Sequence, residues 1–280
     1  MLVIDRIIPL REQLSAWRQS GQSIALVPTM GNLHAGHLSL VEMAKEFADR
    51  IVVTIFVNPV QFVAGEDYDS YPRTIDQDQE MLAASGTDIL FHPPEEEIYP
   101  ENSQNQTIIT VPSLDSIFCG KSRPGHFAGV ATVVAKLFNA IQPDVAIFGE
   151  KDYQQLLVIK QLVRDLCMSV RIIEAPTVRE SDGLAMSSRN VYLNSGERTI
   201  APRLFQVLSR MKEEIINGNR AYMEMEQQAM AELDQAGFAT EYVAIRAAEN
   251  LAEAGTGDLV VLAAACLGKA RLIDNVVIRR

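Results

Sequence analysis

The sequence lacks paired cysteines, long apolar runs and a recognisable export signal. Its three cysteines, Cys119, Cys167 and Cys266, lie far apart and form no C-x-x-C pair, so they provide neither a disulfide framework nor a zinc pattern. The first residues show no basic region followed by an apolar run, so we expect no signal peptide. The longest apolar stretch, 259–267, is about half of the ~20 residues that a spanning helix needs. We therefore expect a soluble, cytoplasmic protein without a membrane partner.

The sequence also has fewer basic than acidic residues. The 25 Lys and Arg residues are outnumbered by 36 Asp and Glu residues, which gives a formal net charge of −11. Nucleic-acid backbones are bound by clustered Lys and Arg, so this balance argues against a general nucleic-acid binder. It still allows a nucleotide pocket, because a few local cations can outweigh the global charge. With 280 residues, the chain is long enough for two domains.

Three common catalytic and nucleotide-binding signatures are missing. No G-x-G-x-x-G follows the first candidate strand, which argues against a dinucleotide site and hence against a dehydrogenase. There is no G-x-x-x-x-G-K-[ST], so the chain is not a P-loop enzyme, and there is no G-x-S-x-G nucleophile elbow. If the protein binds phosphates, it must do so with other residues.

Apolar runs alternate with helical patterns over the first two thirds of the chain. The runs are nearly continuous, which is typical of strands that are covered on both faces. They predict strands at 23–27, 51–57, 88–92, 144–148 and 170–174, with helices at 35–48, about 73–85, 126–141 and 153–167. This order predicts a doubly wound, mostly parallel sheet, that is, a Rossmann-like α/β domain at 1–175. The long Pro-rich segment 93–124 predicts irregular structure with one possible strand at 107–111.

The pattern changes near residue 176. A turn-rich connector leads to predicted helices at 195–217 and 219–236, followed by strands near 240–247, 258–264 and 270–278. Helices followed by a small sheet predict a separate C-terminal α+β domain at 176–280.

Two histidines follow the first candidate strand, in the stretch PTMGNLHAGH. His34 and His37 fall at the start of the helix 35–48, where their spacing places both rings on one face of the first turn. A helix start offers unpaired N–H groups and the positive end of the dipole, and Gly31 and Gly36 allow a ligand to approach the backbone. Phosphate contact is the interpretation that we favour. A metal site and plain capping or packing remain alternatives at this point.

A second cluster, FGEKDYQQ, follows the candidate strand 144–148. Gly149 would let a nucleotide approach closely, and Lys151 would supply a point charge for a phosphate. Asp152 could cap the next helix or hold a ribose hydroxyl or a magnesium-bound water. Gln155 lies one turn along, on the same side as Lys151. Taken alone, this cluster also fits a solvated surface turn.

Two further loops carry polar side chains. In GLAMSSRN, the hydroxyls of Ser187 and Ser188 and the guanidinium of Arg189 could wrap a polyphosphate, although a polar interdomain linker would look similar. In FVNPVQF, Asn58 and Gln61 supply amides that could bind a carboxylate or hydroxyl, or could simply stabilise the loop.

Together these motifs resemble the pantothenate synthetase (pantoate–β-alanine ligase) family over essentially the whole chain. The motifs that carry the resemblance occur in the family's order: PTMGNLHAGH, FVNPVQF, YPR, RPGHF, FGEKDYQQ and MSSRN. The HxGH element alone indicates only the wider nucleotidyltransferase and class I aminoacyl-tRNA synthetase superfamily. Its combination with FVNPVQF and GEKDYQQ narrows the resemblance to one family.

The resemblance implies an ATP-dependent, AMP-forming ligation in two half-reactions. The carboxylate of (R)-pantoate would attack the α-phosphorus of ATP, giving pantoyl adenylate and pyrophosphate. The amine of β-alanine would then attack the acyl carbon, giving pantothenate and AMP. The resemblance also implies a homodimer, with Mg²⁺ as the counterion of ATP and no fixed protein metal site.

The resemblance further assigns roles to individual residues. His34 and His37 would contact the phosphates, with His37 as proton donor to the leaving group, and Lys151 would stabilise charge at the α-phosphate. Gln61 and Gln155 would hydrogen-bond pantoate, and Gln61 would also lie near β-alanine. The expected ATP-binding residues are Met30, Gly31, Asn32, Leu33, His34, Ala35, Gly36, His37, Gly149, Glu150, Lys151, Asp152, Val178, Met186, Ser187, Ser188 and Arg189.

The remaining expectations concern domain closure and two residues that we do not expect to act in catalysis. The C-terminal domain carries few candidate catalytic residues, which suits a lid that closes through the connector 177–190 and excludes water from the adenylate. The segment 60–72 could be a second flap. We expect Arg123 and His126 to serve in loop or subunit contacts rather than in catalysis.

Three rival functions share parts of this pattern. A nucleotidyltransferase would use the same HxGH pocket but keep the nucleotide in its product, so release of free AMP with pyrophosphate distinguishes the two. A tRNA synthetase is disfavoured because the chain is short and acidic and shows no anticodon-binding module. A catalytically inactive nucleotide sensor is disfavoured because both histidines, Lys151 and Arg189 are present.

Overall fold

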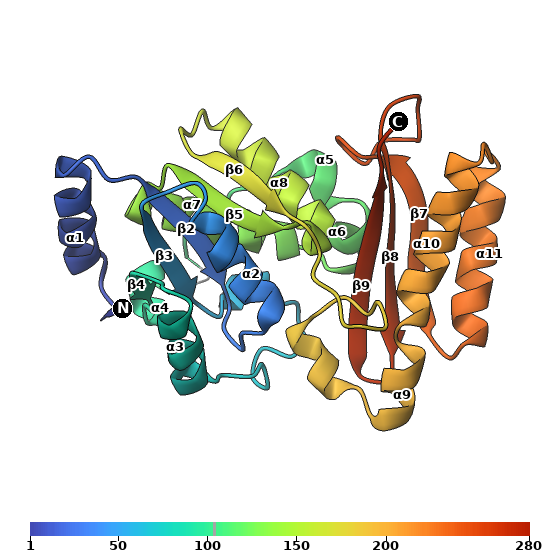
Figure 1. Ribbon diagram of the computed structural model, residues 1–280, viewed down its shortest axis with the longest axis horizontal. Helices are drawn as coiled ribbons and strands as arrows, with labels where there is room; N and C mark the ends of the chain where they lie inside the picture. Colours follow the sequence, from blue (N-terminus) through green and yellow to red (C-terminus); the bar gives the residue numbers. More distant parts are fainter. Residues whose placement is uncertain (103–104) are drawn as a thin grey trace. The chain divides into compact units, whose positions relative to one another are not determined.

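The computed structural model describes residues 1–102 and 105–280 (Figure 1). The chain forms two compact units: Met1–Glu150 with Val158–Pro176, and Lys151–Leu157 with Thr177–Arg280. None of the helices in the described part combines the length and apolar character needed to cross a membrane.

The first unit is built on a six-stranded sheet in which every pairing is parallel. Its order is β1-β4-β3-β2-β5-β6, and the strands span Leu2–Ile4, Ile24–Thr29, Arg50–Ile55, Ile89–Phe91, Val145–Gly149 and Arg171–Ala175 for β1 to β6. The strand order reverses between β2 and β5, which pair directly. In open parallel sheets ligands bind beyond the carboxyl ends of the strands at such a reversal. This architecture confirms the predicted Rossmann-like α/β class.

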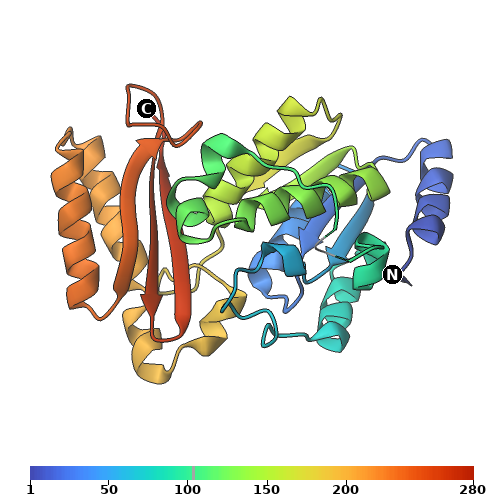
Figure 2. The ribbon, with the colours of Figure 1, turned by 180° about the vertical axis from the view of Figure 1, so that it is seen from behind.

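Helices cover both faces of this sheet. On one face, α2 (Ala35–Ala44) and α3 (Ile75–Ala84) pack through Val41 and Leu82 into a core that contains Ile147. On the other face, Phe138 of α7 (His126–Ile141) packs edge-on against Phe148 of β5. Figure 2, seen from behind, shows α7 on the face opposite α2. The other helices are α1 (Ile7–Gln19), α4 (Glu95–Ile98), α5 (Pro112–Asp115), α6 (Phe118–Ser122) and α8 (Tyr153–Asp165), with short 3₁₀ turns η1 (Pro59–Gln61) and η2 (Glu150–Asp152).

The predicted strand at 107–111 is wrong. This stretch is irregular, and the N–H of Ile109 donates to the hydroxyl of Thr132, at 2.9 Å, instead of to a neighbouring strand. The surrounding segment 93–124 contains three short helices, α4 to α6, and its residues 103–104 lie outside the described residues.

The second unit contains a three-stranded antiparallel sheet in the order β7-β8-β9, with strands at Ala239–Ala247, Leu259–Leu267 and Ala270–Ile278. Helices α10 (Arg203–Ile216) and α11 (Tyr222–Gln235) pack on it through a shared apolar core that includes Leu208 and Val261. The unit also contains α9 (Ser195–Ile200) and the 3₁₀ turn η3 (Ser188–Tyr192). This sheet confirms the predicted small α+β part of the fold.

One predicted helix of this unit, 195–217, is in fact two helices. A turn at Ala201 and Pro202 separates α9 from α10, although both residues keep right-handed helical dihedral angles. Proline has no N–H to donate and its ring clashes with the preceding turn, so the first helix ends there.

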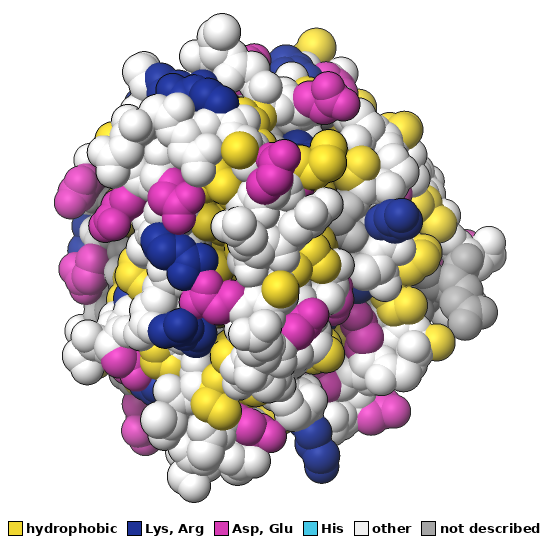
Figure 3. Space-filling view, turned by 90° about the vertical axis from the view of Figure 1, so that its right-hand side faces the viewer, with side chains coloured by type: hydrophobic (Ala, Val, Ile, Leu, Met, Phe, Trp, Pro, Cys, Tyr) yellow, Lys and Arg dark blue, Asp and Glu magenta, His cyan; other side chains and the backbone are white. Residues whose placement is uncertain are grey.

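Figure 3 shows the face that carries α10 and α11. Acidic and basic side chains are interspersed on the described part of this face, and ion pairs such as Arg210–Glu232 and Arg203–Glu232 link the two helices. The charges on this face are therefore mixed and do not form a one-sign surface of the kind that binds nucleic acid.

Candidate active site

The two histidines of the HxGH element form the cap of α2. His34 is the N-cap residue, with an extended backbone, and its Nδ1 accepts a hydrogen bond from the N–H of Gly36 at 3.1 Å. In return, Nδ1 of His37 accepts from the N–H of His34 at 3.3 Å. The rings lie 4.1 Å apart between centroids. This is a reciprocal capping box with imidazoles in place of the usual hydroxyl and carboxylate.

The cap determines which nitrogen of each ring carries the proton. Both Nδ1 atoms accept from a backbone N–H, so the neutral form of each ring has its proton on Nε2. Protonation of either ring at Nδ1 would place two N–H donors opposite each other, because Nδ1 now accepts from a backbone N–H. The geometry therefore favours two neutral imidazoles, each with an Nε2–H donor, so capping and phosphate contact are compatible roles.

A buried aspartate of α3 fixes the loop between β2 and α2. Oδ2 of Asp78 accepts from the N–H of Asn32 at 2.9 Å, and Oδ1 accepts from the N–H of Leu33 at 2.8 Å. The loop needs this support because Gly31 and Asn32 have positive φ values of 83° and 50°. A Cβ on Gly31 would lie 3.1 Å from both Asp78 Oδ2 and Ile55 Cγ2. The sequence interpretation missed Asp78, because its two partners lie more than 40 residues away in the chain.

The amide of Gln61 is oriented by its neighbours. Asn58, which is buried, donates through Nδ2 to Gln61 Oε1 and to the carbonyl of Gly129, each at 3.1 Å. The hydroxyl of Tyr99 donates to Asn58 Oδ1 at 2.6 Å, and burial raises the pKa of Tyr99 far above its usual range, so the hydroxyl keeps its proton. With Oε1 engaged, Gln61 turns its NH₂ group to Met30 Sδ, 2.8 Å away. Gln61 therefore presents a donor beside the β2–α2 loop, which suits a carboxylate or hydroxyl oxygen.

Arg123 and His126 hold the backbone of Gln61. His126 is buried, and its Nδ1–H donates to the carbonyl of Gln61 at 2.7 Å, while its Nε2 accepts from Arg123 Nη1 at 2.9 Å. Arg123 also pairs with both oxygens of Glu66. Burial alone would raise the pKa of Glu66, but the hydrogen bonds from Arg123 and from the Val63 N–H, with the Arg123 charge, bring it below its ordinary value. These residues connect the segment 60–72 to the start of α7.

The other expected residues of the first unit lie at the end of β5 or in the segments that follow β2 and β5. Gly149 ends β5 and a Cβ there would meet nothing within 4 Å, whereas Glu150 opens η2. Leu33 packs in the apolar core, so only its backbone is available to a ligand. Ala35 and Gly36 form the first turn of α2.

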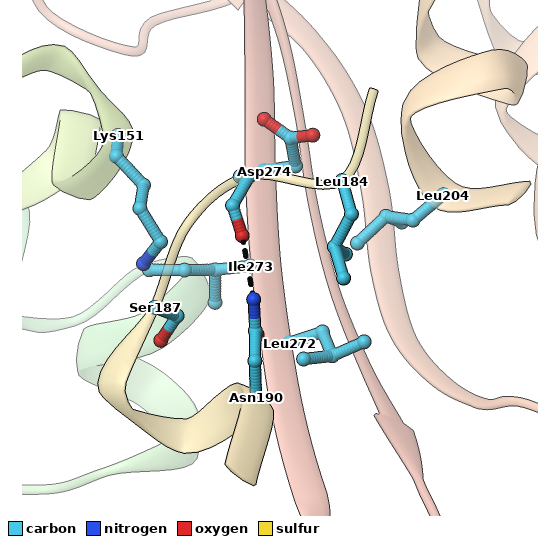
Figure 4. Close-up of a pocket in the computed structure, with 9 residues that line it drawn as sticks. Lys151, Leu184, Ser187, Asn190, Leu204, Leu272, Ile273 and Asp274 are labelled. Atoms are coloured by element: carbon cyan, nitrogen blue, oxygen red, sulfur yellow. Dashed lines mark hydrogen bonds between the residues drawn. The ribbon is translucent and has the colours of Figure 1, made fainter. Parts of the chain in front are cut away.

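The second unit gathers Lys151 and the connector around a small pocket (Figure 4). The side chains of Lys151 and Ser187 lie on the same side of this pocket, which has room for about one water molecule. Ser187 caps η3, its hydroxyl accepting from the N–H of Arg189 at 3.3 Å. Asn190 donates to the carbonyl of Ala185 at 3.1 Å, which closes the loop around the pocket.

The connector itself is braced from β9. Arg179 forms two hydrogen bonds with Asp274, at 2.6 and 2.8 Å, and its guanidinium lies 3.7 Å from the ring centre of Phe205. Burial raises the pKa of Asp274, while the bonds from Arg179 act in the opposite direction. Gly183 must lack a Cβ here, because one would lie 2.6 Å from Phe205.

The expected site residues are thus distributed over both units. The first unit holds Met30 to His37, Gln61, Gly149 and Glu150, and the second holds Lys151, Asp152, Gln155, Val178, Met186, Ser187, Ser188 and Arg189. Within the second unit, the N–H of Met186 donates to the carbonyl of Val178 at 3.0 Å, which joins the two sides of the connector. Gln155 lies on the first turn of α8 and is partly exposed.

Comparison with known proteins identifies one family over the whole chain. A family model described as pantoate-beta-alanine ligase matches residues 2–277. The chain is 51% identical to a pantothenate synthetase of Shewanella halifaxensis over 280 residues, covering 99% of each chain. It is 54% identical to one of Laribacter hongkongensis over 276 residues, covering 98% of this chain and 99% of the relative.

Solved structures lead to the same family. A pantothenate synthetase of Thermus thermophilus superposes with a TM-score of 0.91 at 43% identity, covering 99% of each chain. A pantoate-beta-alanine ligase of Francisella tularensis, described as complexed with beta-gamma ATP and beta-alanine, gives a TM-score of 0.81 at 37% identity, covering 99% of this chain and 97% of that one. The resemblance read from the motifs is therefore confirmed.

Proposed function

The chain belongs to the pantoate–β-alanine ligase family, and we propose that it catalyses the ATP-dependent condensation of (R)-pantoate with β-alanine to pantothenate. The observation that carries this proposal is the imidazole capping box, which holds two Nε2–H donors at the start of α2, beyond the carboxyl end of β2. Hydrogen-bond donors at a helix N-terminus suit phosphate oxygens.

The first half-reaction is adenylation. A carboxylate oxygen of pantoate attacks the α-phosphorus of ATP, the bond from that phosphorus to the bridging oxygen breaks, and pyrophosphate leaves. Negative charge grows on the phosphate oxygens and on the leaving group. Preorganised donors aimed at that charge lower the barrier because they need no reorganisation during the step.

His34, His37 and Lys151 are proposed to act on this charge. The capping box supports neutral imidazoles that donate hydrogen bonds through Nε2–H. Proton donation by His37 to the leaving group, which we also propose, requires the imidazolium form of that ring. Lys151 supplies a full positive charge at the transferring phosphate. We propose that Ser187, Ser188 and Arg189 bind the β- and γ-phosphates.

Pantoate binding is proposed for Gln61 and Gln155. The amide orientation of Gln61 supports a donor role toward an oxygen of pantoate.

In the second half-reaction the β-alanine amine attacks the acyl carbon, the bond to the adenylate oxygen breaks, AMP leaves and the amine loses a proton. The proposed adenine and ribose contacts are those of the Met30–Leu33 loop, Gly149, Glu150, Asp152, Val178 and Met186.

Several properties of the protein extend this proposal. Magnesium arrives with ATP as part of the substrate; among the described residues no three His, Cys, Asp or Glu side chains are grouped as a metal site. The second unit acts as a lid that shields pantoyl adenylate from water. The enzyme works in the cytoplasm as a homodimer. Light scattering of the purified protein would test the dimeric state.

Product analysis tests the function. The protein would be incubated with ATP, Mg²⁺ and D-pantoate, with and without β-alanine, and the nucleotides separated. AMP, pyrophosphate and pantothenate formed in equal amounts only with both substrates would support the ligase. A product that retains the nucleotide would indicate a nucleotidyltransferase, and tight ATP binding without turnover would indicate a sensor.

A further inference from the structure

The main chain of Lys151 is held by the last strand of the protein. Asn275 of β9 donates through Nδ2 to the carbonyl of Lys151 at 3.0 Å, across 124 residues of sequence. Asn275 is 5% exposed, and the hydrogen bond is partly buried. A buried amide that bonds a carbonyl restrains the position of that peptide group, because a buried polar group that loses a partner costs free energy.

A second buried bond holds the same turn of chain. The hydroxyl of Tyr153 donates to the carbonyl of Ala248, just after β7, at 2.9 Å. Tyr153 is itself buried. Although Lys151 precedes residue 176, its contacts and those of its neighbours up to Leu157 group it with Thr177–Arg280. Lys151 thus belongs to the unit that carries β7 to β9.

The same position on β9 also anchors the connector. Asp274 accepts both hydrogen bonds from Arg179, and Arg179 Nη2 donates to the carbonyl of Asn275 at 3.3 Å. The backbone N–H of Asn275 donates to Asp274 Oδ1 at 2.7 Å, which orients the Asp274 carboxylate. Lys151 and Ser187 line one pocket with Asp274 (Figure 4). Adjacent residues of β9 therefore fix Lys151 on one side and the connector on the other.

We propose that Asn275 is a positioning residue for Lys151, and that β9 keeps Lys151 and the phosphate-binding connector in one rigid block. The role assigned to Lys151 rests on the proposed function. If this unit closes as a lid, Lys151 travels with Ser187 and Arg189 instead of staying with the parallel sheet. The charge at the α-phosphate is then completed only when the unit closes, which restricts adenylation to the closed state.

A double-mutant cycle tests this coupling. The four proteins are the wild type, Asn275→Ala, Lys151→Ala and the double variant, and the rate is that of single-turnover pyrophosphate release with ATP, Mg²⁺ and pantoate. We expect Asn275→Ala to slow this step about tenfold, since a misplaced catalytic group costs one to two orders of magnitude. In the Lys151→Ala background the same change should cost less than about twofold, because residues that act as a unit are non-additive.

A purely structural role would give a different result. If Asn275→Ala slowed the reaction equally in both backgrounds, or not at all, the proposal would be overturned. Asn250→Ala is the matched control, because Asn250 accepts from the N–H of Ala252 in an exposed turn of the same unit, and we expect its rate to be unchanged. If Asn275→Ala does not fold, Tyr153→Phe removes the other anchor with little loss of volume, and it should show the same dependence on Lys151.

ATP binding separates this proposal from the proposed function. The Kd for ATP, measured by calorimetry without pantoate, should rise for Asn275→Ala in the wild-type background and should change little in the Lys151→Ala background. Additive effects on this Kd would overturn the coupling. A wild-type protein that binds ATP but releases no pyrophosphate would overturn the ligase function, while the binding cycle would still decide the role of Asn275.

Discussion

Replacement of Asp78 should weaken both the β2–α2 loop and the binding of ATP. The carboxylate accepts two backbone N–H groups, from Asn32 and Leu33, and Asp78 is only 1% exposed. In Asp78→Asn, one side-chain atom becomes a donor and faces an N–H, so one bond is lost and one buried donor is left unsatisfied. A buried unsatisfied group costs about 1–3 kcal/mol, so we expect the free energy of unfolding to fall by about 2 kcal/mol.

The loop effect should also appear in ligand affinity. Because the loop leads directly into the His34 cap, a displaced loop moves the imidazole donors, and we expect the Kd for ATP to rise about tenfold, equivalent to about 1.4 kcal/mol. Urea unfolding followed by circular dichroism gives the first quantity and calorimetry gives the second. Asp76→Asn is the control, since Asp76 is exposed in the first turn of the same helix and its loss should cost at most about 1 kcal/mol. An Asp78→Asn protein that matches this control in both measurements would refute the reasoning.

Three other variants test contacts around the same site. Gly31→Ala should raise the KM for ATP and lower the free energy of unfolding by about 1–2 kcal/mol, because the backbone there has φ 83° and a Cβ would be crowded; Gly257→Ala, where a Cβ would meet nothing within 4 Å and which lies outside the proposed site, should change neither in the same assays. His126→Ala should raise the KM for pantoate about tenfold with the KM for ATP nearly unchanged, since it releases the Gln61 carbonyl. The pKa of Glu66 is lowered in the folded protein, so its stabilising contribution is present above its ordinary value of 4.5 and is lost as the pH falls below it. Thermal midpoints at pH 7 and pH 4 should therefore differ less for Glu66→Gln than for the wild type.

Two comparisons test the reasons given for the His126 and Glu66 variants. His126→Asn keeps a donor close to the position of Nδ1, so partial recovery of the pantoate KM is expected, and equal losses in His126→Asn and His126→Ala would contradict the positioning role. Equal pH dependence in Glu66→Gln and the wild type would show that the Arg123–Glu66 pair contributes no pH-dependent stability.

The parts of the fold that could be predicted are those with local signals. Strands β2, β3 and β5 are nearly continuous apolar runs, and this composition predicts burial on both faces. Strand β1 has only three residues and lies at the edge of the sheet, with Leu2 and Val3 half exposed, so it carries no such signal. The stretch 107–111 has β-prone residues, but strand formation also needs a partner, and here the Ile109 N–H bonds a side chain instead.

The candidate site likewise has residues that the local sequence predicts and residues that only the fold brings together. The His34–His37 pair could be predicted because a cap and its helix are adjacent in sequence. The roles of Asp78 and Asn275 could not, because their partners lie 46 and 124 residues away and only the tertiary fold brings them together. Arg123 and His126 were expected in loop or subunit contacts, and the structure shows that they hold the Gln61 carbonyl and the 60–72 segment.

The most direct test of the central proposal is an isotope-transfer measurement. Pantoate labelled with ¹⁸O in its carboxylate would be incubated with the enzyme, ATP, Mg²⁺ and β-alanine, and the phosphorus products examined by mass spectrometry. Attack of the carboxylate on the α-phosphorus leaves one labelled oxygen on AMP after the amine displaces it, so the proposal predicts one ¹⁸O atom in AMP and none in pyrophosphate. Label in inorganic phosphate, together with ADP, or unlabelled AMP would contradict activation through pantoyl adenylate.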